Sequence, residues 1–369
     1  MKKIHRLFAA SLLLLVLLLL LPMAAWSRTT TYVVHVSVDG LRSDAVTILG
    51  HSNAPNFYRL RAEGAFTDNA RTDVDYLGTL PNHITQLTGR GVGGSRGHNY
   101  KDNRFPPLLR TIHSNKGAYV ASVFDVVHDH GLSTALFTSK EKFQILRQSY
   151  NSINGAMDQT GADNGRGKID YYRYQEDTGK LIDDFIATMH IRRFNYSFIH
   201  LRDPDSAGHE EYWDVTPGSA YLKAVARVDR LLGKLLDFIS GDRELAGKTV
   251  LIVTSDHGGT YGSNHTIVDG RKNYTIPFYV WGAGVPAGKD LYTMNRETRL
   301  DPGTGRPPYS APIQPIREGD AANLVLSLLG LGPVPGSTIN HAQDLRVTGE
   351  HSAISPVWLV LVLALVLLL

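Results

Sequence analysis

The chain has 369 residues, of which 43% are hydrophobic and 20% charged, so its composition excludes a disordered protein and suits one large or two ordinary domains. Its net charge of +3 is small for this length and no block of like charges stands out, so there is no nucleic-acid-binding footprint. Because the sequence contains no cysteine, a metal site must use His, Asp and Glu.

The N-terminus has the pattern of a secretory signal. Three basic residues precede an apolar run from Leu7 to Leu21, and small residues follow at Ala25 and Ser27. This order predicts a signal peptide over residues 1–27. The alternative is an N-terminal membrane anchor that is not cleaved, because the apolar run is long for a signal and short for a span.

Strand and helix patterns alternate along the rest of the chain. Strands are expected at Val33–Val38, Ala118–Phe124, Phe194–Leu201, Thr249–Thr254 and Ile276–Trp281. Helices are expected from Pro55 to Gly64, Thr79 to Gly89, Leu181 to His190, Ser219 to Phe238 and Asp320 to Leu329. Residues 151–168 and 290–314 have loop compositions. The alternation predicts an α/β fold with a mostly parallel sheet covered by helices on both faces.

The C-terminus is apolar from Val357 to Leu369, which as a helix would reach only about 20 Å, short of a bilayer core. Behind a polar spacer, such a tail resembles a GPI-attachment signal, and the alternative is a short retained anchor. We therefore expect a single catalytic domain over residues 28–347, a tail over 348–369, and a secreted or membrane-tethered protein on the outer face.

Three of the predicted strands end on acids. Asp39 follows the first strand, Asp203 and Asp205 follow Leu201, and Asp256 follows Thr254. The carboxyl ends of parallel strands share one edge of a sheet, where ligands bind in open α/β folds. The sequence therefore predicts a cluster of carboxylates there, although Asp39 alone could be an ordinary turn residue.

Histidines accompany these acids at His209, His257 and His265. Asp and His form the ligand set of a zinc-type site, and this number of them suits two ions better than one. Paired ions clamp the attacking and leaving oxygens in phosphoryl transfer. The set predicts two Zn²⁺ ions and a small phosphoester substrate.

Thr79 is the candidate nucleophile. It stands two residues before Pro81, at a predicted helix N-terminus, where free amides and the helix dipole favour a developing anion. The alternative is an ordinary helix N-cap, since threonine is a common one.

Other histidines have simpler interpretations. His83 is expected to support the site or the core without binding metal, and His35 to be buried inside the first strand. His128 and His130 are interpreted as loop residues.

The motifs together carry a family resemblance. They are VSVDGLRSD, GTLPNHITQLTGR, DPDSAGH, VTSDHGG and the later His265, in that order along the chain. On these motifs the sequence resembles the alkaline phosphatase superfamily, in particular its type I phosphodiesterase and nucleotide pyrophosphatase branch.

The resemblance implies roles for individual residues. Asp39, Thr79, Asp256 and His257 would hold one zinc ion, and Asp205, His209 and His265 the other. Thr79 would attack phosphorus and form a phospho-enzyme that water hydrolyses. Asn103 would contact a phosphoryl oxygen. The implied reaction is hydrolysis of a phosphodiester or pyrophosphate bond, with phosphomonoesters still open.

Departures from the family pattern leave alternatives. A related sulfatase needs a Cys or Ser nucleophile followed by Pro and Arg, whereas this chain has Thr79 and Asn82-His83. Lys140 and Lys142 partly match a Lys-x-Arg pair that contacts phosphate in some monoesterases, so Lys140 is a candidate substrate-binding residue. Both lysines could instead lie on a solvated helix face. Another alternative is a surface binding protein without catalysis. The sequence determines neither the leaving group of the substrate nor the oligomeric state.

Overall fold

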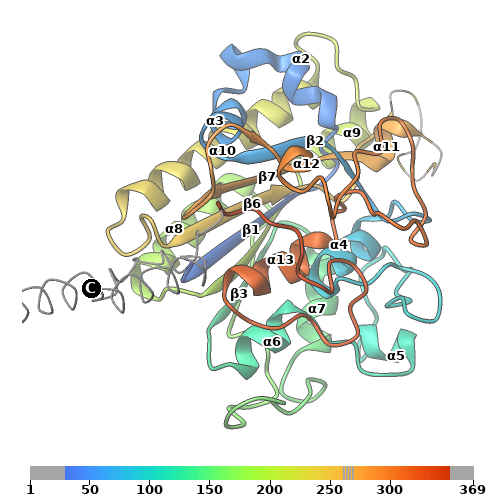
Figure 1. Cartoon of the computed structure of the whole chain (residues 1–369), viewed down its shortest axis with the longest axis vertical. Helices are drawn as coiled ribbons and strands as arrows, with labels where there is room; N and C mark the ends of the chain where they lie inside the picture. Colours follow the sequence, from blue (N-terminus) through green and yellow to red (C-terminus); the bar gives the residue numbers. More distant parts are fainter. Residues whose placement is uncertain (1–29, 261, 263–264, 266, 268–269, 350–369) are drawn as a thin grey trace, which may run out of the picture.

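The computed structural model describes residues 30–260, 262, 265, 267 and 270–349 (Figure 1). The predicted signal peptide at 1–27 and the predicted tail beyond residue 349 lie outside the described residues. Within the described part, no helix is both long and apolar enough to cross a bilayer.

A single eight-stranded sheet organises the described chain, with the strand order β4-β3-β5-β1-β6-β7-β2-β8. The strands are β1 (Tyr32–Val38), β2 (Ala65–Arg71), β3 (Thr134–Thr138), β4 (Tyr171–Tyr174), β5 (Tyr196–Leu201), β6 (Thr249–Thr254), β7 (Thr275–Gly282) and β8 (Lys289–Asp290). β7 runs antiparallel to β6 and β2, and the other paired neighbours are parallel. The predicted fold class, a mostly parallel sheet, is confirmed.

β1 lies near the middle of this sheet because its valines are buried on both faces. It pairs in parallel with β5 on one side and β6 on the other. The register places Val38 opposite Leu201 and Ser37 opposite Thr254. The three strands therefore end together, and the residues that follow them meet at one edge.

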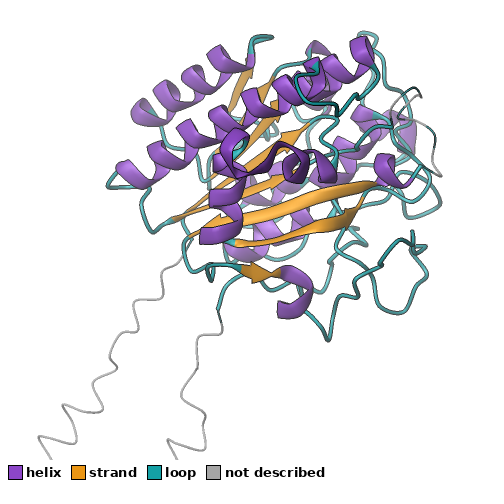
Figure 2. Ribbon diagram, turned by 90° about the horizontal axis from the view of Figure 1, so that it is seen from above, coloured by secondary structure: helices purple, strands orange, loops and turns teal. Residues whose placement is uncertain are grey.

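Helices cover both faces of the sheet (Figure 2). One face packs against α2 (Ser43–Asn53), α3 (Pro55–Glu63), α8 (Thr178–Ile191) and α10 (Ala220–Gly241). The other packs against α4 (Thr79–Thr88), α6 (Val123–Asp129) and α13 (Asp320–Leu328). Shorter helices are α5 (Ile112–Lys116), η1 (Glu141–Phe143), α7 (Gln144–Ser149), α9 (Asp203–Glu211), α11 (Arg271–Tyr274) and α12 (Leu291–Met294).

The strand predicted at Ala118–Phe124 is wrong. Ser122 and Asp125 form a capping box there, so the chain enters α6 at Val123, and the strand of this region is β3, eleven residues further on. β2, β4 and α2 had no clear signal in the sequence and were not predicted, and the predicted loop over 290–314 contains α12. Edge strands such as β4 are only partly buried and lack the apolar run that signals a central strand.

Candidate active site

Three carboxylates meet at the carboxyl edge of the sheet. Asp39 follows β1 directly, Asp256 lies two residues beyond β6, and Asp205 is in the first turn of α9. All three are at most 2% exposed. The backbone holds them together, because Gly40 N–H donates to Asp256 Oδ1 (3.1 Å) and Asp205 N–H donates to the Asp39 carbonyl (3.0 Å).

His257 lies among these carboxylates. Its Nε2 is 3.3 Å from Asp39 Oδ1, 3.3 Å from Asp256 Oδ2 and 3.7 Å from Asp205 Oδ1. Its Nδ1 lies 2.8 Å from the Gly258 carbonyl oxygen. Because that oxygen can only accept a hydrogen bond, Nδ1 carries the proton of the ring. In the neutral ring Nε2 therefore presents a lone pair to the three oxygens.

The four atoms at the centre of this arrangement are all buried and have no hydrogen-bond partner: Asp39 Oδ1, Asp205 Oδ1, Asp256 Oδ2 and His257 Nε2. Unpaired acceptors that face one another in the interior are costly unless a cation lies between them. Within the described chain they form two overlapping groups that could hold an ion, Asp39-Asp256-His257 and Asp205-His257-His265. The residues present therefore fit divalent metal.

His265 completes the second group, and His209 lies beside it. His265 Nδ1 lies 2.9 Å from the Leu77 carbonyl, so its Nε2 is also left for a ligand, and its ring stacks on His257 at 3.8 Å. His209 Nε2 lies 3.4 Å from Asp205 Oδ1, but its side chain is 54% exposed. The resemblance assigned His257 to one ion only, whereas the geometry places His257 in both groups.

The carboxylates repel one another electrostatically. Burial, and next the charge of Asp39, raises the pKa of Asp256 well above its usual value. Burial alone would lower the pKa of His257, but Asp256 and Asp39 raise it to about 9. A cation is therefore favoured here, and without one a proton takes its place.

Lys140 and His200 contact Asp39 Oδ2, whereas the other oxygen of this carboxylate, Oδ1, faces His257. Lys140 Nζ lies 2.7 Å from Asp39 Oδ2 and also pairs with Asp205 Oδ2, and His200 Nε2 lies 2.9 Å from Asp39 Oδ2. The Lys140 side chain is only 14% exposed, so its interpretation as a solvated surface lysine is wrong. His200 was missed because it sits inside β5, where a buried histidine is usually structural; its register opposite Ser37, two residues before Asp39, was the available signal.

Thr79 is the first residue of α4 and is 2% exposed. The N-cap is Gly78, so the alternative that Thr79 only caps the helix is wrong. Leu80 N–H and Lys142 Nζ both donate to Asn103 Oδ1, each at 2.9 Å. With its oxygen used in this way, the Asn103 side chain has its NH₂ group left to donate beside the helix N-terminus.

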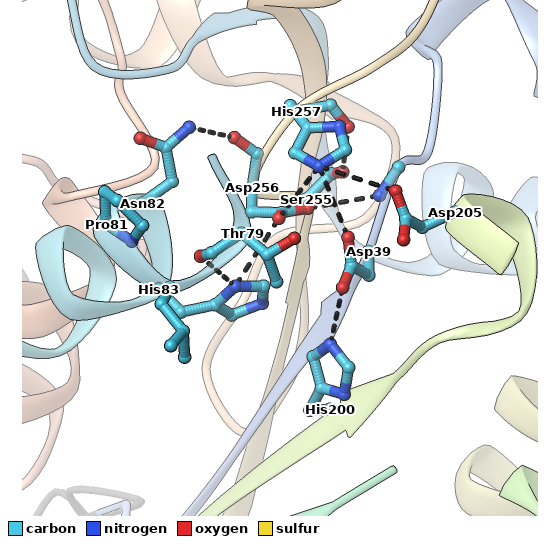
Figure 3. A network of polar contacts seen from close by, with 12 residues as sticks. Asp39, Thr79, Pro81, Asn82, His83, His200, Asp205, Ser255, Asp256 and His257 are labelled. Carbon is cyan, nitrogen blue, oxygen red and sulfur yellow. Dashed lines mark hydrogen bonds and ion pairs between the residues drawn. The ribbon is translucent and has the colours of Figure 1, made fainter. Parts of the chain in front are cut away.

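Two further residues fix this helix against the strand ends (Figure 3). Asn82 Nδ2 donates to the Asp256 carbonyl at 2.6 Å. His83 is buried, with Nδ1 2.7 Å from the Thr79 carbonyl and 3.5 Å from Asp256 Oδ2. Figure 3 shows Thr79 between His83 and the strand-end carboxylates.

A second acidic cluster lies on α6 and the loop before β4. His128, Asp129 and Asp158 could also surround an ion, and His128 is a buried helix residue instead of the loop residue expected from the sequence. Lys168 is almost fully buried and donates to Asp129 Oδ1 and Asp158 Oδ1. Asp158 Oδ1 also lies 3.4 Å from His128 Nδ1, so the lysine already brings a positive charge to this cluster.

The fold and the site agree with the resemblance seen in the sequence. A mostly parallel sheet has Asp and His side chains at its carboxyl edge, and a threonine lies at the N-terminus of a neighbouring helix, as the resemblance to the alkaline phosphatase superfamily led us to expect. The family model for type I phosphodiesterase / nucleotide pyrophosphatase matches residues 114–274, which confirms the resemblance seen in the sequence.

Individual relatives agree with this family. The chain is 26% identical over 278 residues to ectonucleotide pyrophosphatase/phosphodiesterase family member 5 of Homo sapiens, covering 69% of this chain and 53% of that protein. It is 27% identical over 237 residues to family member 1 of Mus musculus, covering 62% of this chain and 24% of that protein. The chain thus spans about half of the first relative and a quarter of the second.

Solved structures show the shared fold. An inactive threonine-to-alanine variant of murine ectonucleotide pyrophosphatase/phosphodiesterase 5, in complex with AMP, superposes with a TM-score of 0.57 at 15% identity, covering 85% of this chain and 99% of that one. A 2-O GAG sulfatase superposes with a TM-score of 0.58 at 12% identity, covering 88% and 76%. Because the two scores are so similar, overall shape does not separate phosphoesterase from sulfatase.

Proposed function

We propose that this protein is a two-zinc phosphoesterase that hydrolyses phosphodiester or pyrophosphate bonds through a phosphorylated Thr79. The observation that carries the proposal is the convergence of unpaired carboxylate and imidazole atoms beside that threonine. The family match to phosphodiesterases and nucleotide pyrophosphatases supports the same reaction class.

Each proposed ion has its own set of residues, and His257, which the geometry places in both groups, is assigned to the first. Asp39, Asp256, His257 and Thr79 would hold one, and Asp205, His209 and His265 the other. When bound, the ions would neutralise phosphoryl charge and lower the pKa of the Thr79 hydroxyl. The aspartates and histidines would hold these ions from the segments that follow three different strands, and Thr79 would reach them from the start of α4.

The protein's own groups carry out the remaining steps. Thr79 Oγ1 forms a bond to phosphorus as the bond to the leaving oxygen breaks, and water then attacks phosphorus and restores the free threonine. The Asn103 NH₂ group would donate to a non-bridging oxygen, and the amides at the start of α4 would favour the negative charge. Asn103 is held for this task by Leu80 N–H and Lys142.

We also propose that the protein acts outside the cell membrane. Residues 1–27 would direct secretion, residues 28–347 would form the catalytic domain, and residues 348–369 would tether it at the outer membrane face. Fractionation of cells that express the full chain, with and without residues 348–369, tests this. Release of the shortened form into the medium is the expected result, and equal retention of both forms contradicts the tether.

The decisive experiment compares Thr79→Ala with Thr88→Ala, a matched change in the same helix. Each variant is assayed with p-nitrophenyl phosphate, bis-p-nitrophenyl phosphate and p-nitrophenyl sulfate, with zinc present. Thr79→Ala is expected to lose at least 1,000-fold in kcat/KM while keeping bound zinc, whereas Thr88→Ala keeps its turnover. Undiminished turnover in Thr79→Ala contradicts the nucleophile.

The same assay separates the alternatives. Sulfate turnover above phosphoester turnover would indicate a sulfatase-like hydrolase. Zinc binding without turnover of any ester would indicate a binding protein that has lost catalysis.

A further inference from the structure

Lys140 joins the two proposed metal sites. Its ammonium contacts Asp39, which belongs to one group of ligands, and Asp205, which belongs to the other. Both contacts use the Oδ2 atoms, while the Oδ1 atoms of the same carboxylates face His257 without a hydrogen-bond partner. The lysine therefore pairs with one oxygen of each carboxylate, and the other oxygen of each faces His257.

Lys168 shows the other possible arrangement in the same molecule. Its ammonium bonds Asp129 Oδ1, Asp158 Oδ1 and the Gly165 carbonyl, so the carboxylates of that cluster already have a cationic partner. The two lysines are alike in bridging two aspartates, but they differ in what they leave unpaired: the Oδ1 atoms of both aspartates beside Lys140 have no partner, whereas beside Lys168 the unpaired atom is His128 Nδ1. Lys140 thus leaves carboxylate oxygens available to a metal ion, and Lys168 does not.

The net charge of the site determines how the ammonium of Lys140 affects metal binding. Asp39, Asp205 and Asp256 supply three negative charges and Lys140 one positive charge, which leaves two negative charges. One divalent ion neutralises them. A second ion then enters a site that already has an ammonium against its carboxylates, and like charges repel strongly where water is excluded.

We propose that Lys140 is a built-in cation that weakens binding of the second divalent ion and holds Asp39 and Asp205 in place before metal arrives. This inference rests on the proposed two-metal function. The lysine has two opposite effects on metal affinity: its hydrogen bonds orient the carboxylates, and its charge repels a divalent ion. The repulsion is the larger effect, because the full charge acts directly on the ion. An ammonium has three donors, so one remains for a phosphoryl oxygen after Asp39 and Asp205 are bonded.

The test is a zinc titration of the metal-free protein against a chromogenic chelator, with thermal unfolding measured in parallel. Wild type is expected to bind one ion at least tenfold more tightly than the second. Lys140→Met is expected to bind the second ion at least tenfold more tightly than wild type, and to melt at a lower temperature without metal. Lys140→Arg keeps the charge and should keep the wild-type difference.

Lys168→Met is the matched control, because it also removes a buried lysine that bridges two aspartates. It is expected to lower the melting temperature and to leave the affinities of the two proposed active-site ions unchanged, and any ion that binds to Asp129 and Asp158 once the lysine is removed is counted as a third. If Lys140→Met does not fold without metal, Lys140→Gln, which keeps a donor but no charge, is used with the same expectation. Unchanged or weaker second-site binding in the uncharged variant overturns this inference, whereas a wild type that binds no zinc overturns the proposed function itself.

Discussion

Asn82 joins the nucleophile helix to the metal edge of the sheet, because its Nδ2 donates to the backbone carbonyl of Asp256 at 2.6 Å. The two residues are 174 positions apart in the chain and both are fully buried. This bond lies within one turn of Thr79, so it fixes the threonine relative to a proposed metal ligand. Catalysis is sensitive to such placement, since a shift of about 1 Å can cost on the order of 100-fold.

Replacing Asn82 with Ala should therefore lower kcat by about 10- to 100-fold and leave the affinity for zinc within about threefold of wild type. The donor disappears, but no proposed ligand does. Steady-state kinetics on bis-p-nitrophenyl phosphate and a zinc titration measure the two effects. Asn82→Asp tests the hydrogen bond separately, because a carboxylate has no N–H to donate, and it should resemble the alanine variant. A wild-type kcat in both variants would show that Asn82 has no part in positioning Thr79.

His200 should strengthen metal binding, in contrast to Lys140. Burial lowers the pKa of His200 to about 4, so the ring is neutral and orients Asp39 through its 2.9 Å hydrogen bond without adding charge. Loss of such a supporting group typically weakens metal binding by about 10- to 100-fold. We expect this loss in His200→Ala and a partial recovery in His200→Gln, measured by chelator competition. His35→Ala removes another buried strand histidine and should leave zinc affinity unchanged; an equal loss there would mean that the effect is only structural.

The sequence allowed the sheet and the strand-end acids to be predicted because both follow from local signals. The valines of β1 and the acid after them are contiguous, and so are Thr249–Thr254 and Asp256. Parallel strands then bring their ends together whatever the residues between them. Asp203, which shares its motif with Asp205, shows the limit of this argument, because its carboxylate turns away to Thr178 and Arg227.

What could not be predicted depends on pairs of residues far apart in the chain. Lys140 is 101 residues from Asp39, and His200 is 161 residues from it. Each is of a type that is usually a surface lysine or a core histidine, and no spacing rule connects it to the acids. Only the register of β1, β3 and β5 brings these side chains to the same edge.

His98 should make the protein sensitive to acid. It is fully buried, Tyr100 N–H donates to its Nδ1 at 3.1 Å, and its Nε2 lies 3.1 Å from the Pro81 carbonyl, so the native ring is neutral. Burial lowers its pKa to about 3. In the unfolded chain His98 takes up a proton below the ordinary histidine pKa of about 6.5, whereas in the folded chain it stays neutral until the pH is near 3. The free energy of unfolding is therefore highest above pH 6.5 and decreases as the pH falls toward 3.

We compare the free energies of unfolding of wild type and His98→Gln. The value for wild type minus the value for the variant should fall by about 3 kcal/mol between pH 7 and pH 4. Urea denaturation at both pH values measures it. Taking the difference removes the contributions of the other buried histidines, which both proteins share. His51→Gln changes an exposed histidine and serves as the control. Parallel pH profiles for wild type and His98→Gln would contradict the assignment.

Gly40 lies directly against the first turn of α9, which carries Asp205. Its φ is +71°, and a Cβ there would lie 2.8 Å from the Cα of Asp205, closer than real Cβ atoms come to other atoms. An alanine must therefore displace the first turn of α9 and with it the Asp205 carboxylate. Gly50 offers a matched control, since its φ is +68° but a Cβ there meets no atom within 4 Å.

Both Gly40→Ala and Gly50→Ala should lose stability, by about 1–2 kcal/mol or more, because a side chain is strained at positive φ. Only Gly40→Ala should also lose zinc, with at least a tenfold weaker affinity, since only there does the added methyl group push a proposed ligand away. Urea denaturation and a zinc titration of the two proteins separate strain from displacement. Equal zinc affinities would mean that Asp205 can shift with the backbone and still reach its ion, which would remove the steric reason for glycine directly after Asp39.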